Sequence, residues 1–279
     1  MATTLPPELL GPAEPLARDA IAELRADRSR LPVVFPGLPR KAGREPVGGG
    51  CQAIGDARVD LDAFRRCDLV AAWLLQEIAV THDEAVDLFL HGDIEERAML
   101  LRAANFLPLG DTTARLLGEV LRTNVVLHME AALCDGDLLA RAAAHGTIDA
   151  ETANRLLLKF AFLDLPLERA LAAERLASVE LSTMLQDLAT EREAAGRAVW
   201  RDTWQMVGRA PCPGAIARLI GGLEHGDDGV RLSAAKGLLA LPDRTAGLAA
   251  EVARYAGERL PREPRPVIRE LLQRLAQPA

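Results

Sequence analysis

The chain has 279 residues, of which 49% are hydrophobic and only 4% aromatic, and its formal net charge is −7. An acidic chain of this kind lacks the basic face that contacts with nucleic-acid phosphates require, so we expect no nucleic-acid partner. The sequence holds no stretch of about 18 uncharged apolar residues, and residues 1–10 lack the basic flank and apolar centre of a signal peptide, so we expect neither a membrane protein nor a secreted one.

Alanine and leucine dominate the composition, which favours close-packed helices over sheets and predicts an all-α protein. The cysteines are Cys51, Cys67, Cys134 and Cys212, and no two of them form a CxxC pair. This wide spacing suits a reducing compartment better than a disulfide framework. We therefore expect free thiols and a cytoplasmic location.

The first predicted element is an amphipathic helix from Pro15 to about Asp27. Leu16, Ile21 and Leu24 mark its apolar side, and charged residues lie between them.

Residues 29–58 are rich in proline and glycine, which predicts a long loop. The basic residues in and beside this region are Arg28, Arg30, Arg40, Lys41 and Arg44. In an acidic protein such an island suggests that the loop holds an anion or acts as a lid, and the alternative is a solvated, mobile connection. The predicted organisation is an N-terminal helix in 1–28, this loop, and a helical-repeat domain in 59–279.

Beyond Asp60 the predicted helices have recognisable start signals. Thr81 with Glu84, and Asp93 with Glu96, have the form of a capping box. Further candidate N-caps are Asp111, Thr147 or Asp149, and Asp227 or Asp228.

Three of the five histidines, His91, His145 and His225, share one local context, because each is followed by glycine and then by aspartate or threonine. We expect each histidine in the last turn of a helix, with the glycine as a left-handed stop. This context explains the histidines without a metal, and the sequence places no set of four ligands at credible spacing around them. We expect no metal site and no cofactor.

Two stretches of the chain repeat each other at one offset. His91-Gly92-Asp93, Arg97 and Leu107-Pro108 align with His225-Gly226-Asp227, Arg231 and Leu241-Pro242. A repeat with helical signals on both sides of a short loop indicates stacked antiparallel helical hairpins. Residues 226–235 also resemble a HEAT repeat, in which an arginine near a helix start pairs with an aspartate of the adjoining turn. The predicted fold class is therefore an all-α, HEAT-like α-solenoid forming a right-handed superhelix, with Arg97 and Arg231 in structural roles.

Residues 119–133 are predicted to form one helix whose apolar residues surround the axis, with polar residues scattered among them. The scattered polar residues are Arg122, Thr123, Asn124, His128 and Glu130. Burying such groups unpaired costs about 1 to 3 kcal/mol each, so an enclosed helix must pair them with neighbouring helices or with a ligand.

Lys159 interrupts the apolar run 156–163. A desolvated lysine loses its proton more readily and can act as a base or form an imine. The alternative is that its stem lies on apolar surface while its ammonium group pairs with a carboxylate such as Glu130. Lys159 and Glu130 are thus the candidate acid–base residues.

In residues 179–196 the helical spacing places Leu181, Leu185 and Leu188 on one face, and Arg192 falls in the middle of the same face. An arginine directed at the core needs an acceptor there. The acceptor is either a protein carboxylate or an anionic substrate bound in a cleft.

At these residues the chain resembles the EboA-domain family, well over about 119–208 and loosely upstream. The pieces that carry the resemblance are Leu121-Arg122-Thr123-Asn124, Glu130-Ala131-Ala132, Asn154 with Lys159 and Phe162, Arg175 ahead of Glu180-Leu181, and residues 191–197 leading to Trp204. The chain departs from the family pattern at Ala153 and Glu193, where tryptophan is usual, and at Ser178, where asparagine is usual. These losses would enlarge or relocate a pocket.

The resemblance implies a bacterial protein encoded beside enzymes of a small secondary-metabolite pathway, among them a membrane prenyltransferase, and linked to precursor handling or export. The family's recurring polar residues coincide with the embedded ones. The predicted ligand-binding residues are Arg122, Asn124, His128, Asn154, Arg175, Glu191, Arg192 and Arg197.

The leading hypothesis is a non-catalytic helical-repeat protein that binds a metabolite or a pathway enzyme, because no nucleophile with its base is recognisable. The alternative is an enzyme acting on a small anionic or isoprenoid substrate, with Lys159 or Glu130 as acid or base and with Arg122 and Arg192 holding the anion. The third possibility is a purely structural scaffold. A cavity bordered by Lys159 and Arg192 would favour ligand binding, whereas a closed network of ion pairs would favour the scaffold.

Overall fold

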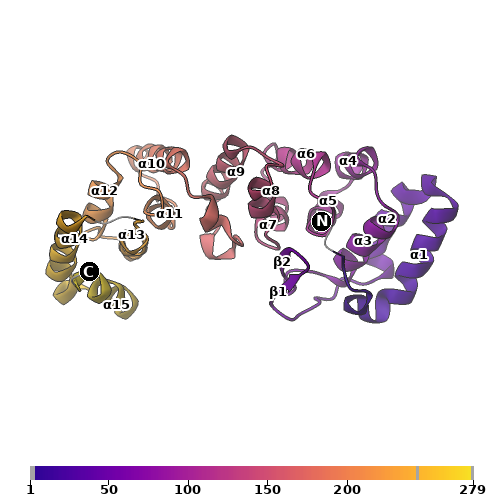
Figure 1. The fold of residues 1–279 in the computed structure, drawn as a ribbon, viewed down its shortest axis with the longest axis horizontal. Helices are drawn as coiled ribbons and strands as arrows, with labels where there is room; N and C mark the ends of the chain where they lie inside the picture. The colour runs from indigo at the N-terminus through magenta and orange to yellow at the C-terminus, as the bar shows by residue number, and fades with distance from the viewer. Residues whose placement is uncertain (1–3, 243–244, 278–279) are drawn as a thin grey trace. The chain divides into compact units, whose positions relative to one another are not determined.

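The computed structural model describes residues 4–242 and 245–277, and in these ranges the chain is mainly helical, with one small two-stranded sheet (Figure 1). The described residues divide into two compact units. The first comprises Met1–Leu156 and Glu168–Ala173, and the second comprises Leu157–Leu167 and Glu174–Ala279. The predicted all-α class is thus confirmed apart from the small sheet, and the helical part of the chain comprises two units.

The first unit contains eight whole α-helices among the residues described. They are α1 (Glu14–Ala26), α2 (Leu31–Lys41), α3 (Arg66–Glu77), α4 (His82–His91), α5 (Ile94–Ala103), α6 (Asp111–Val120), α7 (Val126–Leu133) and α8 (Leu138–Ala144). The short 3-10 helix η1 (Pro7–Ala13) precedes α1, and η2 (Arg28–Arg30) follows it. The helix predicted from Pro15 to about Asp27 is therefore confirmed as α1.

The core of the first unit is built around α3. All of residues 67–75 are buried, so this helix is covered on every side. Helix α5 packs against both α3 and α7, while α4 contacts α5 and α6. Figure 1 shows these helices in succession along the unit. The apolar composition of α3 therefore reflects its central position rather than an amphipathic face.

The prediction of a continuous loop over 29–58 is wrong, because α2 occupies Leu31–Lys41 although Pro36 and Pro39 lie inside it. Leu31, Val34, Phe35 and Leu38 are all buried and follow the i, i+3, i+4, i+7 pattern of a helix face. A proline inside a helix costs about 3 kcal/mol through the lost hydrogen bond and the clash with the preceding turn. Burial of this apolar face outweighs that cost.

The remainder of the predicted loop contains a β-hairpin of β1 (Cys51–Ile54) and β2 (Ala57–Asp60), paired antiparallel in the register Cys51↔Asp60. Gly55 has φ +61 and supplies the positive φ that the first central position of such a two-residue turn requires. On its other edge β2 meets the segment after α7. The Asp60 amide donates to the Asp135 carbonyl at 3.0 Å, and the Asp137 amide donates to the Arg58 carbonyl at 2.9 Å.

Helix α9 (Ala150–Phe162) carries the chain from the first unit into the second. The further helices of the second unit are α10 (Val179–Ala194), α11 (Thr203–Val207), α12 (Ala215–Gly222), α13 (Asp228–Leu239), α14 (Ala246–Arg259) and α15 (Pro266–Ala276). Short 3-10 helices lie at Leu167–Arg169, Ala173–Leu176 and Leu260–Arg262. Helix α13 is central in this unit, since it packs against α11, α12 and α15.

Most of the predicted helix starts are confirmed. Thr81 and Asp93 both form complete capping boxes, with Glu84 and Glu96 respectively. The Asp149 side chain accepts a hydrogen bond from the Thr152 amide at 2.8 Å. Asp227 caps α13, whereas Asp111 is the first residue of α6 rather than its N-cap, which is Gly110.

The three His-Gly segments are not alike. Gly146 is left-handed, with φ +67, as expected after His145. Gly92 has an extended backbone, with φ −68 and ψ 153, and Gly226 is not in the left-handed region either. The prediction of a left-handed stop is therefore right for one histidine and wrong for the other two. At Gly92 the aspartate cap of α5 follows at once, so the chain needs an extended residue there.

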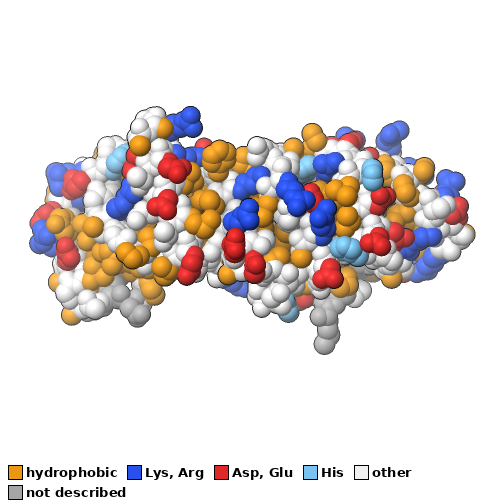
Figure 2. Space-filling model, turned by 90° about the horizontal axis from the view of Figure 1, so that it is seen from above, with side chains coloured by type: hydrophobic (Ala, Val, Ile, Leu, Met, Phe, Trp, Pro, Cys, Tyr) orange, Lys and Arg blue, Asp and Glu red, His pale blue; other side chains and the backbone are white. Residues whose placement is uncertain are grey.

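The four cysteines are free thiols, as predicted, and only Cys51 is exposed. Burial raises the pKa of Cys67 to about 11 and that of Cys134 to about 12, so both thiols stay protonated near neutral pH. No helix in the described ranges is long and apolar enough to cross a bilayer. On the face shown in Figure 2, acidic and basic side chains are interspersed, and hydrophobic side chains also reach the surface.

Candidate functional site

The predicted enclosed helix over 119–133 does not exist, because α6 ends at Val120 and α7 begins at Val126. The hydroxyl of Thr123 accepts a hydrogen bond from the Val125 amide at 3.2 Å, an interaction of the kind that competes with a helix. Arg122 and Asn124 lie in this break and are exposed. The Arg122 guanidinium pairs with Glu119 at 2.8 Å and its side chain is 69% exposed, so it is not embedded as predicted.

His128 is buried in α7, as the sequence predicts. Its Nε2 lies 3.0 Å from the carbonyl oxygen of Ile94, while its Nδ1 is buried and has no hydrogen-bond partner among the described residues. The bond to a carbonyl requires the proton on Nε2, which leaves Nδ1 as a bare acceptor. Burial lowers the pKa of this imidazole, so the ring favours the neutral form.

The two candidate acid–base residues have different surroundings. Glu130 pairs with Arg169, within the first unit. Lys159 is half-buried, and burial lowers the pKa of its ammonium group. Asn154 is buried, whereas Arg175 is exposed. None of these four residues lines the pockets described below.

A closed polar network, which sequence reasoning missed, lies in the core of the first unit. The Arg102 guanidinium donates to the Asp135 carboxylate at 2.7 Å and lies 3.3 Å from the Asp68 carboxylate. Asp68 also forms an ion pair with Arg65 at 3.1 Å. Burial raises the pKa of Asp135, an effect that the Arg102 guanidinium opposes. Because these charges satisfy one another, we assign the network to the architecture of the unit rather than to ligand binding.

Arg192 joins two helix ends in the second unit. Its guanidinium is 2.5 Å from the Asp164 carboxylate and donates to the carbonyl oxygens of Phe162, at 2.9 Å, and Ala198, at 3.3 Å. The side chain is only 12% exposed, which agrees with the core-directed position predicted from the helical spacing. Of the two acceptors considered, the protein carboxylate is the one observed.

A hollow of about 370 Å³ opens beside this junction, and we call it the α10 pocket. It is lined by Phe162, Asp164, Leu188, Glu191, Arg192, Ala195, Arg197 and Ala198. Three of the predicted ligand-binding residues thus share one pocket. Lys159, the predicted second border of a cavity with Arg192, is absent from this lining.

The geometry of the α10 pocket follows from the end of its helix. Gly196 has φ +66, and the Arg197 amide donates to the Arg192 carbonyl at 2.8 Å, so the chain turns sharply after α10. This turn places Arg197 at the pocket. No ion pair or side-chain hydrogen bond engages Arg197 or Glu191 within the described ranges, in contrast to Arg192 and Asp164.

Phe162 supplies an apolar wall to the α10 pocket, and 59% of its surface is exposed. The segment after it is fixed, because the Trp200 indole donates to the Leu165 carbonyl at 2.8 Å and Asp202 accepts from the Leu167 amide at 2.9 Å. Sequence reasoning named Phe162 only as part of a motif and missed Asp164. The signal available was the apolar run that stops just before Asp164.

One family model, described as "Metabolite traffic protein EboA", matches residues 57–208. The chain belongs to the EboA family. The matched residues include the α10 pocket and the buried network of Arg102, Asp68 and Asp135, whereas α12–α15 lie outside them. Comparisons with curated proteins and with solved structures give no match.

Proposed function

We propose that this EboA-family protein binds a small metabolite with an anionic group in the α10 pocket, as part of metabolite traffic. The observation that carries the proposal is that Glu191, Arg192 and Arg197, all predicted as ligand-binding residues, line one hollow. The family description supports a metabolite as the ligand. A volume of about 370 Å³ suits a small molecule, since ligand pockets usually measure about 300 to 1,000 Å³.

The two arginines of the α10 pocket have different tasks in this proposal. Arg192 is held by Asp164 and two carbonyl groups, so it shapes the wall and has little capacity left for a ligand. Arg197 has no such partners in the described part of the chain, and its planar guanidinium suits a carboxylate or phosphate. Arg197 therefore binds the anionic group.

The remaining lining limits the charge and shape of the ligand. Asp164 and Glu191 balance the two arginines, so the pocket does not favour a ligand with several negative charges. The exposed ring of Phe162 offers a flat apolar surface in the pocket that Arg197 also lines. We therefore expect a monoanionic ligand with an apolar or aromatic part.

The second proposal is the enzyme, with Lys159 or Glu130 as acid or base. The lowered pKa of Lys159 is the observation in its favour, because desolvation makes the ammonium group give up its proton more readily. Neither Lys159 nor Glu130 lines the α10 pocket, so binding without chemistry is the better-supported function. The finer expectations of a bacterial secondary-metabolite pathway, a prenyltransferase partner, a cytoplasmic location and a HEAT-like superhelix are kept as proposals.

Calorimetric titration of the full chain with benzoate, benzamide and benzylamine tests the proposal, since the three probes share a ring and differ in charge. We expect benzoate to bind most tightly. Arg197→Ala should lower the affinity for benzoate by about tenfold, as for the loss of one charge-assisted hydrogen bond. The matched control is Arg155→Ala, which removes an exposed arginine of α9 that does not line the pocket. Equal affinity for the three probes, or an equal effect of the two variants, would refute the proposal.

The natural ligand can be sought in the same protein. Mass spectrometry of small molecules released by denaturing the purified chain should detect a monoanion that is depleted in the Arg197→Ala protein. Incubation of the protein with a cell extract tests the second proposal, which predicts that the mass of a substrate changes and that Lys159→Ala abolishes the change.

A further inference from the structure

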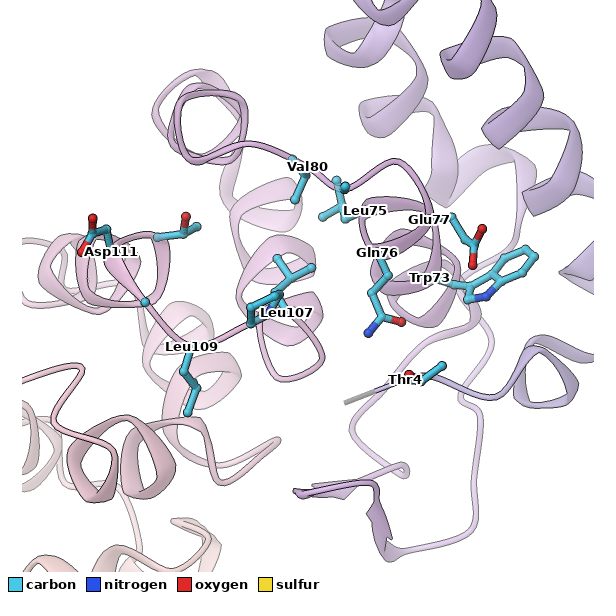
Figure 3. Close-up of a pocket in the computed structure, with 13 residues that line it drawn as sticks. Thr4, Trp73, Leu75, Gln76, Glu77, Val80, Leu107, Leu109 and Asp111 are labelled. Atoms are coloured by element: carbon cyan, nitrogen blue, oxygen red, sulfur yellow. The ribbon is translucent and has the colours of Figure 1, made fainter. Parts of the chain in front are cut away.

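A second pocket lies within the first unit, and none of the residues predicted for ligand binding lines it. We call it the α3 pocket. It has a volume of about 540 Å³ and is lined by Thr4, Trp73, Leu75, Gln76, Glu77, Ala79, Val80, Leu107, Pro108, Leu109, Gly110, Asp111 and Thr112. Figure 3 shows Gln76 of α3 between Trp73 and the segment that carries Leu107, Leu109 and Asp111.

The walls of the α3 pocket are held together by one side chain. The amide nitrogen of Gln76 donates to the Phe106 carbonyl at 2.6 Å, and its amide oxygen accepts from the Leu5 amide at 3.2 Å. Gln76 thereby connects α3 to the α5–α6 connection and to the N-terminal segment. The backbone after α3 is strained at Ala79, which has φ +47 although it is not glycine. Such strain persists only where the surrounding structure enforces it, so this wall is preformed.

The lining of the α3 pocket is mostly apolar. The apolar side chains are Trp73, Leu75, Ala79, Val80, Leu107, Pro108 and Leu109. In Figure 3, Leu75 and Val80 lie on the same side of the pocket, opposite Thr4. Apolar walls with a few polar groups are typical of sites that bind the carbon skeleton of a small molecule.

The charged groups of the α3 pocket are all acidic, since its lining contains no lysine, arginine or histidine. Glu77 is neutralised by Arg25, whose guanidinium lies 2.8 Å from its carboxylate. Asp111 has no ion pair in the described ranges. It is the first residue of α6, where the positive end of the helix dipole stabilises a carboxylate. A carboxylate without an ion pair in the described ranges therefore borders an apolar pocket.

From these observations we infer that the α3 pocket is a binding site for a small apolar molecule with one protonated amine. The apolar skeleton packs against Val80, Leu107 and Leu109, and the ammonium group is attracted to Asp111. This charge preference is opposite to that proposed for the α10 pocket. The two sites therefore bind different classes of ligand, and neither proposal depends on the other.

Octylamine, octanol and octanoate serve as probes, because they share one apolar chain and carry a positive, no and a negative charge. They are titrated into the full chain carrying Arg197→Ala, so that binding of octanoate in the α10 pocket does not mask the result. We expect calorimetry to show octylamine binding most tightly, octanoate about tenfold more weakly and octanol between them, as for attraction and repulsion by one partly screened charge. Asp111→Asn keeps the shape of the side chain and should abolish this order. No saturation by any probe at millimolar concentration, or an affinity for octanoate equal to that for octylamine, would overturn the inference.

The location is tested by Leu109→Trp, which fills the pocket from a half-buried position. This variant should lower the affinity for all three probes by at least about tenfold, because it removes the volume that the apolar chain occupies. Leu90→Trp is the matched control, since Leu90 is an exposed leucine of α4 outside the pocket lining. Equal binding by both variants would place the probes elsewhere. If Leu109→Trp loses its helical circular dichroism, the order of the three affinities in the Arg197→Ala chain, with and without Asp111→Asn, still tests the inference.

Discussion

Arg97 and Arg231 each donate a hydrogen bond to the carbonyl oxygen of a glycine five residues earlier. The distance is 2.8 Å from Arg97 Nε to the Gly92 carbonyl and 3.0 Å from Arg231 Nη1 to the Gly226 carbonyl. These positions correspond in the internal duplication, so the same local device occurs in both units. The predicted partner is wrong, however, because neither guanidinium forms an ion pair with an aspartate of the described residues. Arg97 donates to the Gly92 and Leu90 carbonyl groups and lies over the Phe89 ring, whereas Arg231 pairs with Glu263 at 2.8 Å.

This difference predicts that replacing Arg231 lowers the free energy of unfolding more than replacing Arg97. Arg231→Met leaves the fully buried Glu263 carboxylate with Arg259 and the Arg265 amide as its partners, and we expect it to lower the unfolding free energy by about 2 to 3 kcal/mol. Arg97→Met removes two bonds to carbonyl groups near the surface and should cost about 1 kcal/mol. Urea titrations followed by circular dichroism measure both values. Equal losses would contradict the assignment of Glu263 as the main partner.

Glu263 should also make the second unit sensitive to acid. Burial favours its neutral form, but hydrogen bonds from Arg231, the Arg265 amide and Arg259 outweigh this and lower its pKa from 4.5 to about 2. A carboxylate whose pKa is lower in the folded state stabilises the fold above pH 4.5, and this stabilisation is lost as the pH falls towards 2. Urea titrations from pH 6 to 2 should show a steeper loss for the unmodified chain than for Glu263→Gln. If the unfolding free energy fell equally with pH in both proteins, Glu263 would not be the source of the acid sensitivity.

The burial of His128 should make the stability of the first unit depend on pH as well. Burial lowers its pKa, so the folded state prefers the neutral ring, whereas the unfolded chain binds a proton near the ordinary value of 6.5. The contribution of His128 is therefore complete above pH 6.5 and declines as the pH falls below it. Hydrogen exchange of α7 amides at pH 7.5 and 5.5 measures the effect. In His128→Phe, whose ring can pack against Phe89 as the imidazole does, the α7 difference between the two pH values should shrink.

Substitutions of Arg192 and Arg197 should differ in their effects on the stability of the protein and on ligand binding. Arg192→Ala removes the ion pair with Asp164 and the bonds to two carbonyl groups, and we expect a loss of about 2 kcal/mol in unfolding free energy. Arg197→Ala should change stability by less than about 0.5 kcal/mol, because the side chain is exposed and unpaired in the described part of the chain. Thermal unfolding beside benzoate titration measures both properties. A large stability loss in Arg197→Ala would show that it too is structural.

Sequence signals that act within a single helix predict the structure reliably. The capping residues Thr81, Asp93 and Asp227 were predictable because side-chain caps act within one turn of helix. The burial of Arg192 followed from its position on the face of Leu181 and Leu185. These predictions need only local geometry.

Predictions from sequence were wrong or missing where contacts between distant residues decide the structure. Pro36 and Pro39 suggested a loop, but the buried face that includes Phe35 keeps α2 helical. The buried pair of Arg102 and Asp135 joins residues far apart in the sequence, and no short motif announces it. The α3 pocket was missed for the same reason, since Thr4, Trp73 and Leu107 come together only in the folded unit.

The route of the chain has a consequence for anyone who wishes to work with a shorter protein. The backbone leaves the first unit within α9, returns for Glu168–Ala173 and then leaves again, so no single cut separates the two units. A fragment limited to the family match would end at residue 208, keeping α11 but discarding α13, against which it packs. Trp204 and Val207 would then lose part of their cover. We expect such a fragment to aggregate, which makes point substitutions in the intact chain the sounder way to dissect its two pockets.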